Sequence, residues 1–237
     1  MRVLVGTSGY AFKEWKGPFY PEDMPDAGML GYYATQFPTV EINNTFYRLP
    51  KEHVMREWAA QVPDEFRFAL KASQRITHHA RLKEEAASPL EFLLKNLAAM
   101  DPKLGVVLFQ CPPNLKKDLP RLQRFCDLLP GDRRFTFEFR HASWFEDDVV
   151  AELRARNHAL TVTDQDDFAS PMIPTADWGY LRLHRYDYDA HSLATWARRV
   201  QDEPWKEAYV FFKHDYEPFA GPPAVRGFTD ALQGQGG

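Results

Sequence analysis

Two glutamates in the sequence, Glu41 and Glu138, could act as an acid–base pair. Each stands within a short apolar segment, VEI at 40–42 and FEF at 137–139. One protonated and one ionised carboxyl group can hydrolyse a glycosidic or phosphoester bond when both flank it. His184 follows another apolar segment and could move protons or bind a ligand. We therefore expect Glu41, Glu138 and His184 to be catalytic.

Several positively charged side chains stand at the ends of such segments and predict a small anionic or polyhydroxyl ligand. The arginine guanidinium in particular binds phosphate and carboxylate groups in a bidentate manner. Aromatic side chains in the adjoining loops could stack on a sugar or base, and packing in a lid over the first helix is an equal alternative. The residues expected to bind substrate are Asn43, Tyr47, Lys71, Gln110, Arg140, His141, Trp144, Asp164, Arg182 and Lys213.

The same polar side chains also have a purely structural interpretation. Glu138 could form interior ion pairs with Arg140 or Arg182, because buried charges need partners. The polar layer would then hold the strands together without binding a ligand.

Metal-assisted hydrolysis is a further alternative. Oxygen and imidazole ligands are available in Glu138, His141, Asp164, His184 and His214. No HExxH motif joins them, so the identity of any metal or cofactor stays unknown.

Nucleophilic catalysis has less support. Ser8 lacks the GxSxG motif of nucleophilic serines, and Cys111 precedes two prolines without a local base. The pair His78-His79 lies in a basic loop, and we expect it on a solvated surface.

Alternating residues in the stretch 134–144, RFTFEFRHASW, predict the β-strand that would position Glu138. Its phenylalanines fall on one face, and Thr136, Glu138 and Arg140 fall on the other. Further apolar segments predict strands at 3–6, 39–42, 67–70, 104–109, 159–163, 179–183 and 208–212. Helices are predicted at 29–37, 51–61, 89–100 with Ser88 as N-cap, 119–129, 147–156, 190–200 and 224–232.

Eight strands, most of them followed by a helix, indicate a closed parallel (β/α)8 barrel in a single domain of residues 1–237. In this TIM-type fold, residues at the carboxyl ends of the strands converge on one mouth, where active sites lie. The sixth unit has two prolines in 166–178 and no helical period, so we expect it to be irregular. An open doubly wound sheet is the alternative, but no GxGxxG motif follows the first strand.

The composition argues against several classes of protein. A net charge of −4 provides no global basic field, so nucleic-acid binding is not favoured. Two cysteines without CxxC spacing suit a reduced, cytoplasmic protein. The apolar runs are too short for a membrane-spanning helix or a signal peptide, so we expect no membrane association.

Several short motifs follow one another along nearly the whole chain. They are VGTSGY at 5–10, WKG at 15–17, FYP at 19–21, VEINNTFY at 40–47, TH at 77–78, QCPP at 110–113, EFRH at 138–141 with Trp144, and YLRLH at 180–184. Together they resemble the YecE-like family, also catalogued as domain of unknown function 72. The resemblance implies a TIM-type barrel. It implies no particular activity, because the family has no established one.

The sequence therefore favours a TIM-barrel enzyme of the hydrolase or lyase class that acts on a small anionic or sugar-like substrate. Its site would lie at the C-terminal mouth of the barrel. The alternatives are a non-catalytic barrel that binds nucleotides or nucleic acid, and a metal-dependent phosphodiesterase.

Overall fold

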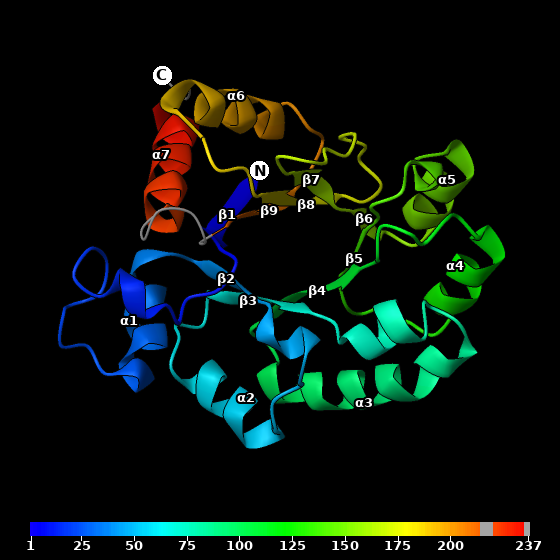
Figure 1. Ribbon diagram of the computed structural model, residues 1–237, viewed down its shortest axis with the longest axis horizontal. Helices are drawn as coiled ribbons and strands as arrows, with labels where there is room; N and C mark the ends of the chain where they lie inside the picture. Colours follow the sequence, from blue (N-terminus) through cyan, green and yellow to red (C-terminus); the bar gives the residue numbers. More distant parts are fainter. Residues whose placement is uncertain (214–219, 235–237) are drawn as a thin grey trace.

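The protein folds as a ring of parallel strands with helices around its outside (Figure 1). The computed structural model describes residues 1–213 and 220–234. Within these residues the strands are β1 (Arg2–Thr7), β2 (Thr39–Ile42), β3 (Arg67–Lys71), β4 (Leu104–Gln110), β5 (Phe135–Glu138), β6 (Ala159–Leu160), β7 (Val162–Asp164), β8 (Trp178–Leu183) and β9 (Glu207–Phe212). The helices are α1 (Met29–Gln36), α2 (Glu52–Ala60), α3 (Ala87–Leu97), α4 (Leu119–Cys126), α5 (Asp147–Ala155), α6 (Ala190–Gln201) and α7 (Gly221–Gly234). The arrangement confirms the expected TIM-type barrel.

The strand order is β6-β5-β4-β3-β2-β1-β9-β8-β7, and every pairing is parallel. The two ends of this order, β6 and β7, are separated along the chain by Thr161 alone. β6 pairs with β5 and β7 pairs with β8, so together they take the place of one barrel strand. The strand predicted at 159–163 is therefore two short strands, and the backbone at Thr161 completes the ring.

Hydrogen bonds from the connection 165–177 explain the irregular sixth unit. Thr175 Oγ1 accepts from the Leu160 N–H at 2.7 Å, and Ser170 Oγ accepts from the Thr163 N–H at 2.8 Å. These side chains satisfy buried backbone groups that a regular strand would pair with a neighbour. No helix lies between β7 and β8 in the residues 165–177, all of which the structure describes, as the missing helical period predicted.

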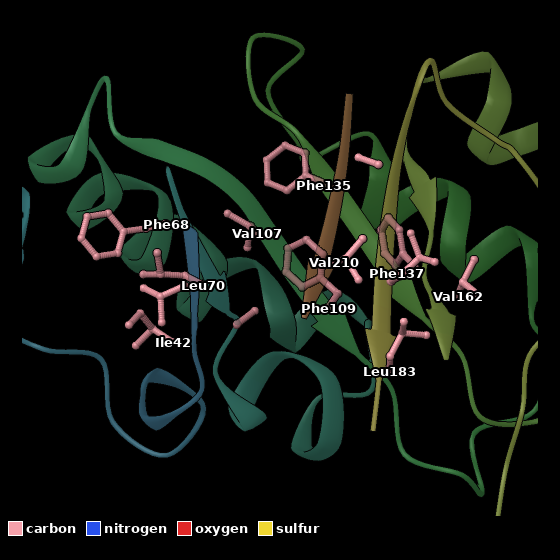
Figure 2. Packing of buried hydrophobic residues seen from close by; sticks show 14 of the residues in the cluster. Ile42, Phe68, Leu70, Val107, Phe109, Phe135, Phe137, Val162, Leu183 and Val210 are labelled. Carbon is pink, nitrogen blue, oxygen red and sulfur yellow. The ribbon is translucent and has the colours of Figure 1, made fainter. Parts of the chain in front are cut away.

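Side chains of the strands alternate between the barrel interior and the layer beneath the helices. On β5, Phe135 and Phe137 face outward, with ring centroids 5.8 and 5.4 Å from that of Phe109 on β4. Figure 2 shows these rings among aliphatic side chains of neighbouring strands. Thr136 and Glu138 therefore point to the interior, because successive strand residues face opposite sides of a sheet.

Several helix boundaries differ from the sequence prediction, those of α3, α4 and α7 by two or three residues. Helix α3 begins at Ala87, directly after a 3-10 turn at Glu84–Ala86, so Ser88 is not its N-cap. Helix α4 ends at Cys126 instead of 129, and α7 begins at Gly221 instead of 224. Among the described residues, none of the helices combines the length and hydrophobicity needed to cross a bilayer.

Candidate active site

Arg182 on β8 lies between Glu41 on β2 and Glu138 on β5, so the three side chains come from three separate strands. Arg182 Nε lies 3.0 Å from Glu41 Oε2, and its Nη1 lies 2.7 Å from Glu138 Oε2. All three side chains are buried. Each points inward because of the alternation along its strand, so the sequence correctly predicted that these residues converge.

Neighbouring donors fully engage the Glu138 carboxylate. Gln110 Nε2 lies 3.0 Å from both of its oxygens, and Arg140 Nε lies 2.7 Å from Oε1. Burial alone would raise the pKa of Glu138, but the positive charges of Arg182 and Arg140 outweigh it and hold that pKa well below its usual range. The carboxylate is therefore ionised at neutral pH.

Glu41 is held in the same way. Its oxygens accept from the Tyr180 hydroxyl at 2.7 Å and from Asn43 Nδ2 at 2.9 Å, in addition to Arg182. Burial would raise the pKa of Glu41, but Arg182 and the other donors lower it to about 2. Both glutamates are completely buried, and neither lines the cavity described below. This geometry argues against the expected acid–base role of Glu41 and Glu138 and supports the interpretation as interior ion pairs.

The two arginines differ in how many donors they keep for a ligand. Arg182 donates from all three guanidinium nitrogens to the two carboxylates, which argues against its expected role in an anion clamp. Arg140 donates only from Nε to Glu138, and its terminal nitrogens make no hydrogen bond to the residues that the structure describes. Its side chain is 28% exposed and lines the cavity. Arg140 therefore retains donors for a ligand.

A cavity of about 900 Å³ opens over this cluster at the C-terminal face of the barrel. It is lined by eight of the residues selected from the sequence: Asn43, Tyr47, Lys71, Gln110, Arg140, Arg182, His184 and Lys213. Other residues also line it, among them Ser8, Tyr10, Phe12, Asn44, Gln165, Asp166, Asp167 and Tyr186. Ser8 directly follows β1, so its position at a strand end was a usable signal. The others lie in loops, where no periodicity indicates the direction of a side chain.

Trp144 was expected to bind substrate, but it lies in the core instead. It is fully buried, its ring stacks on Phe139 at a centroid distance of 4.1 Å, and its indole N–H donates to the Leu115 carbonyl at 2.7 Å. Trp15 and Tyr20 of the first loop are also buried in the core. The burial of these three rings supports packing over stacking on a ligand.

His141 and Asp164 also lie outside the cavity lining. His141 Nδ1 accepts from the Ser143 N–H at 3.2 Å and so caps the following 3-10 turn. Asp164 accepts from the Tyr188 hydroxyl at 2.8 Å and from Trp196 Nε1 at 3.2 Å, which turns its carboxylate toward α6. Their expected contacts with substrate are therefore not supported.

Lys71, at the end of β3, carries a positive charge that no carboxylate of the described residues neutralises at ion-pair distance. Its Nζ lies 4.2 Å from the centroid of the Phe46 ring. Burial lowers the pKa of Lys71 to about 8, with Arg182 contributing repulsion. Lys71 is therefore mainly protonated at neutral pH and faces the cavity as a cation.

Ser8 and His184 form a hydrogen bond within the lining of the cavity. Ser8 Oγ lies 2.9 Å from His184 Nε2, and both side chains are buried. Burial and the nearby Arg182 hold the pKa of His184 well below its usual range. At neutral pH the imidazole is therefore uncharged and can accept a proton.

The remaining histidines give little support for a metal site. His79 is exposed as expected, whereas His78 is half-buried with its ring centroid 4.9 Å from that of Phe46. In the described residues, no group of three or more His, Cys, Asp or Glu side chains is arranged to hold a metal ion. His214 lies outside the described residues.

Comparisons with known proteins agree with the family resemblance of the sequence motifs. Residues 4–236 match the family model described as "Protein of unknown function DUF72". The UPF0759 protein YunF of Bacillus subtilis is 27% identical over 232 residues, which cover 91% of this chain and 79% of that protein. The UPF0759 protein YecE of Escherichia coli K12 is 37% identical over 117 residues, 49% of this chain and 43% of that protein.

A solved structure gives the same result for the fold. The crystal structure of a DUF72 family protein from Thermotoga maritima has a TM-score of 0.83 and 25% identity, with 98% of this chain and 100% of that chain covered. The family model spans almost every residue, including the strand-end motifs that form the cavity. The chain therefore belongs to the DUF72 family, as the motifs from VGTSGY to YLRLH implied.

Proposed function

We propose that the cavity is the active site of an enzyme of the hydrolase or lyase class that acts on a small anionic or sugar-like substrate. The observation that carries this proposal is the unneutralised Lys71 cation in a cavity that also holds the Ser8–His184 hydrogen bond. A fixed positive charge attracts an anionic group, and a neutral imidazole can move a proton.

The charge beside the buried glutamates supports an anionic group near Lys71 at the end of β3, whereas the carboxylates of the lining, Asp166 and Asp167, follow β7. Arg182 and Arg140 neutralise the two buried glutamates, so that group of four side chains carries no net charge. Lys71 is then a surplus positive charge beside it. We assign Lys71 and the terminal nitrogens of Arg140 to the binding of the anionic group.

Other groups in the lining suit the hydroxyls of a sugar. Asn43 Oδ1 is buried without a hydrogen-bond partner among the described residues, because its Nδ2 is directed to Glu41. A ligand hydroxyl would satisfy this acceptor. Asp166 and Asp167 line the cavity as well and can accept further hydroxyl hydrogens. We therefore propose a ligand with an anionic end near Lys71 and a polyhydroxyl body.

Anion-dependent stability tests the binding part of this proposal. Phosphate, sulfate or citrate should raise the unfolding midpoint of the wild type, by about 2.7 kcal/mol of stability at 100 times Kd. Lys71→Met should lose this gain. Lys206→Met is the matched control, because Lys206 is exposed and paired with Asp177 at the opposite end of the barrel. A wild type indifferent to all three anions contradicts the proposal.

Turnover is measured separately. Sugar phosphates and anionic glycosides are incubated with the protein, and the products are followed by mass spectrometry. We expect turnover that Lys71→Met and His184→Gln both abolish. Tight binding without turnover would instead support the alternative of a non-catalytic binding barrel.

A further inference from the structure

We propose that Ser8 is a nucleophile activated by His184, and that the cavity hydrolyses a carboxylic ester. The Ser8–His184 pair is inferred from its own geometry. That the ester is anionic rests on the function proposed above. A serine hydroxyl bonded to an uncharged imidazole is the arrangement that recurs in acyl transfer on unrelated folds.

The backbone holds both residues firmly. The Ser8 N–H donates to the Phe212 carbonyl of β9 at 2.9 Å, and the His184 N–H donates to the Asp164 carbonyl of β7 at 2.7 Å. Each residue therefore continues the hydrogen bonding of the barrel one position beyond its strand. The 2.9 Å contact between Ser8 Oγ and His184 Nε2 thus joins the ends of β1 and β8 across β9, and both residues are held by backbone hydrogen bonds to the barrel.

The surroundings of His184 keep its imidazole uncharged in the resting protein. The charged groups that face it are Arg182 and Lys213, which disfavour its protonation, and Glu41 and Glu138, which favour it. Burial disfavours its protonation more than any single charge does, so the pKa of His184 lies well below its usual range and the resting imidazole is uncharged. The two glutamates oppose this shift and so reduce the cost of forming the imidazolium during the reaction. This assigns a catalytic consequence to carboxylates that do not themselves touch the cavity.

The proposed reaction proceeds in two steps. Ser8 Oγ bonds to the carbonyl carbon of the ester while its proton moves to His184 Nε2. The bond from that carbon to the leaving oxygen breaks, and the leaving alcohol takes the proton from Nε2. Water then attacks the acylated Ser8 and gives one proton to Nε2, which returns it to Ser8 Oγ as the acid departs. Lys71 and Arg140 of the lining would hold the anionic group of the ester, as proposed above.

A second serine–histidine contact in the same chain provides a matched control. Ser143 Oγ lies 2.9 Å from His141 Nδ1, which is the same separation as in the Ser8–His184 pair. Neither Ser143 nor His141 lines the cavity. The two pairs therefore differ in access to the cavity and in the charged groups around the imidazole.

Labelling with an uncharged alkyl fluorophosphonate tests the proposal on the intact chain. Mass spectrometry should find one adduct, on Ser8, and Ser143→Ala should be labelled as fast as the wild type. Ser8→Ala should not be labelled, and His184→Gln should react roughly 10²- to 10⁴-fold more slowly. Circular dichroism checks that each variant folds. If Ser8→Ala does not fold, the rate at which iodoacetamide alkylates Ser8→Cys is measured with His184 present and with His184→Gln. A lower rate in the second variant shows that the nucleophile depends on His184.

The outcomes separate this inference from the proposed function. Absence of a Ser8 adduct, or a labelling rate that does not change in His184→Gln, overturns the inference and leaves anion binding by Lys71 untouched. A Ser8 adduct that forms equally fast with and without saturating phosphate supports the nucleophile but contradicts an anion site beside it. Protection of Ser8 by phosphate supports both.

Discussion

Arg182 and Glu138 meet at 2.7 Å between Nη1 and Oε2, with 5% and 0% of their side chains exposed. The pair joins β8 to β5, which are separated in the ring by the irregular β6–β7 segment. It therefore spans the place where two short strands replace one continuous barrel strand. The same arginine also binds Glu41 on β2, so one guanidinium connects three strands of the barrel.

Replacing Arg182 should be strongly destabilising. Arg182→Gln leaves two buried carboxylates without their shared cation, and we expect a loss of about 3–5 kcal/mol in the free energy of unfolding. Urea midpoints at pH 7 measure it. Lys206→Gln removes an exposed ion pair and should cost about 0–1 kcal/mol. A loss in Arg182→Gln no larger than in this control would show that the cluster contributes little.

Acid unfolding should depend on Glu41. Its pKa is lowered from 4.5 to about 2 in the folded protein, so the unfolded chain binds protons more readily in this range. The carboxylate thus stabilises the fold above pH 4.5, and this contribution is lost as the pH falls toward 2. Glu41→Gln should be less stable at pH 7 and should show a flatter decline below pH 4.5. Urea midpoints at several acidic pH values test this, with the exposed Glu91→Gln as control.

The sequence predicted the parts of the site that lie in regular strands. Alternation on β5 and β8 correctly placed Glu138 and Arg182 in the interior, because side-chain direction in a strand has a period of two residues. The barrel followed from counting apolar segments. The split at Thr161 could not be predicted, since it depends on hydrogen bonds with Ser170 and Thr175 farther along the chain.

The sequence predicted the functional roles of the site residues less well than it predicted their positions. The sequence does not reveal whether the acceptors of a strand-end glutamate, or the donors of a strand-end arginine, are used within the protein or face a ligand. Arg182 uses its donors internally and Arg140 does not, which only the three-dimensional contacts reveal. Ser8 was set aside because no local motif marks it, and its partner His184 comes from a strand on the other side of β9.

Trp144 and Tyr47, both expected to contact substrate, should differ in how their substitution affects stability and ligand affinity. Trp144 is buried, so Trp144→Ala should cost about 3–5 kcal/mol in stability without a specific change in ligand affinity. Tyr47 is 75% exposed and lines the cavity, so Tyr47→Ala should change stability by less than about 0.5 kcal/mol. If Tyr47 stacks on the ligand, its loss should weaken binding by about 1 kcal/mol or more. Calorimetric titration with a sugar phosphate measures ligand affinity, and urea midpoints measure the stability of both variants. If Trp144→Ala and Tyr47→Ala changed stability equally and affinity equally, Trp144 would not be a core residue and Tyr47 a ligand contact.

Sulfate binding should weaken as the pH rises through the pKa of Lys71. That pKa is lowered to about 8, so the side chain is mostly charged at pH 7 and mostly neutral at pH 9. Sulfate keeps its own charge over this range, and its affinity should fall roughly tenfold. The stability effect has the opposite direction. Between pH 8 and 10.5 the unfolded chain holds the Lys71 proton more tightly than the folded protein, so stability rises with pH.

Variants of Lys71 separate these two effects. Lys71→Met should bind sulfate weakly at every pH, and it should be more stable than the wild type at pH 7 because it no longer buries a charge. This advantage should shrink above pH 10, where the wild-type amine is neutral in the fold. Lys71→Arg keeps its charge throughout, so its sulfate affinity should not fall between pH 7 and 9. Calorimetric titrations at the two pH values decide the matter, and a wild-type affinity that is the same at both would mean that Lys71 does not hold the anion.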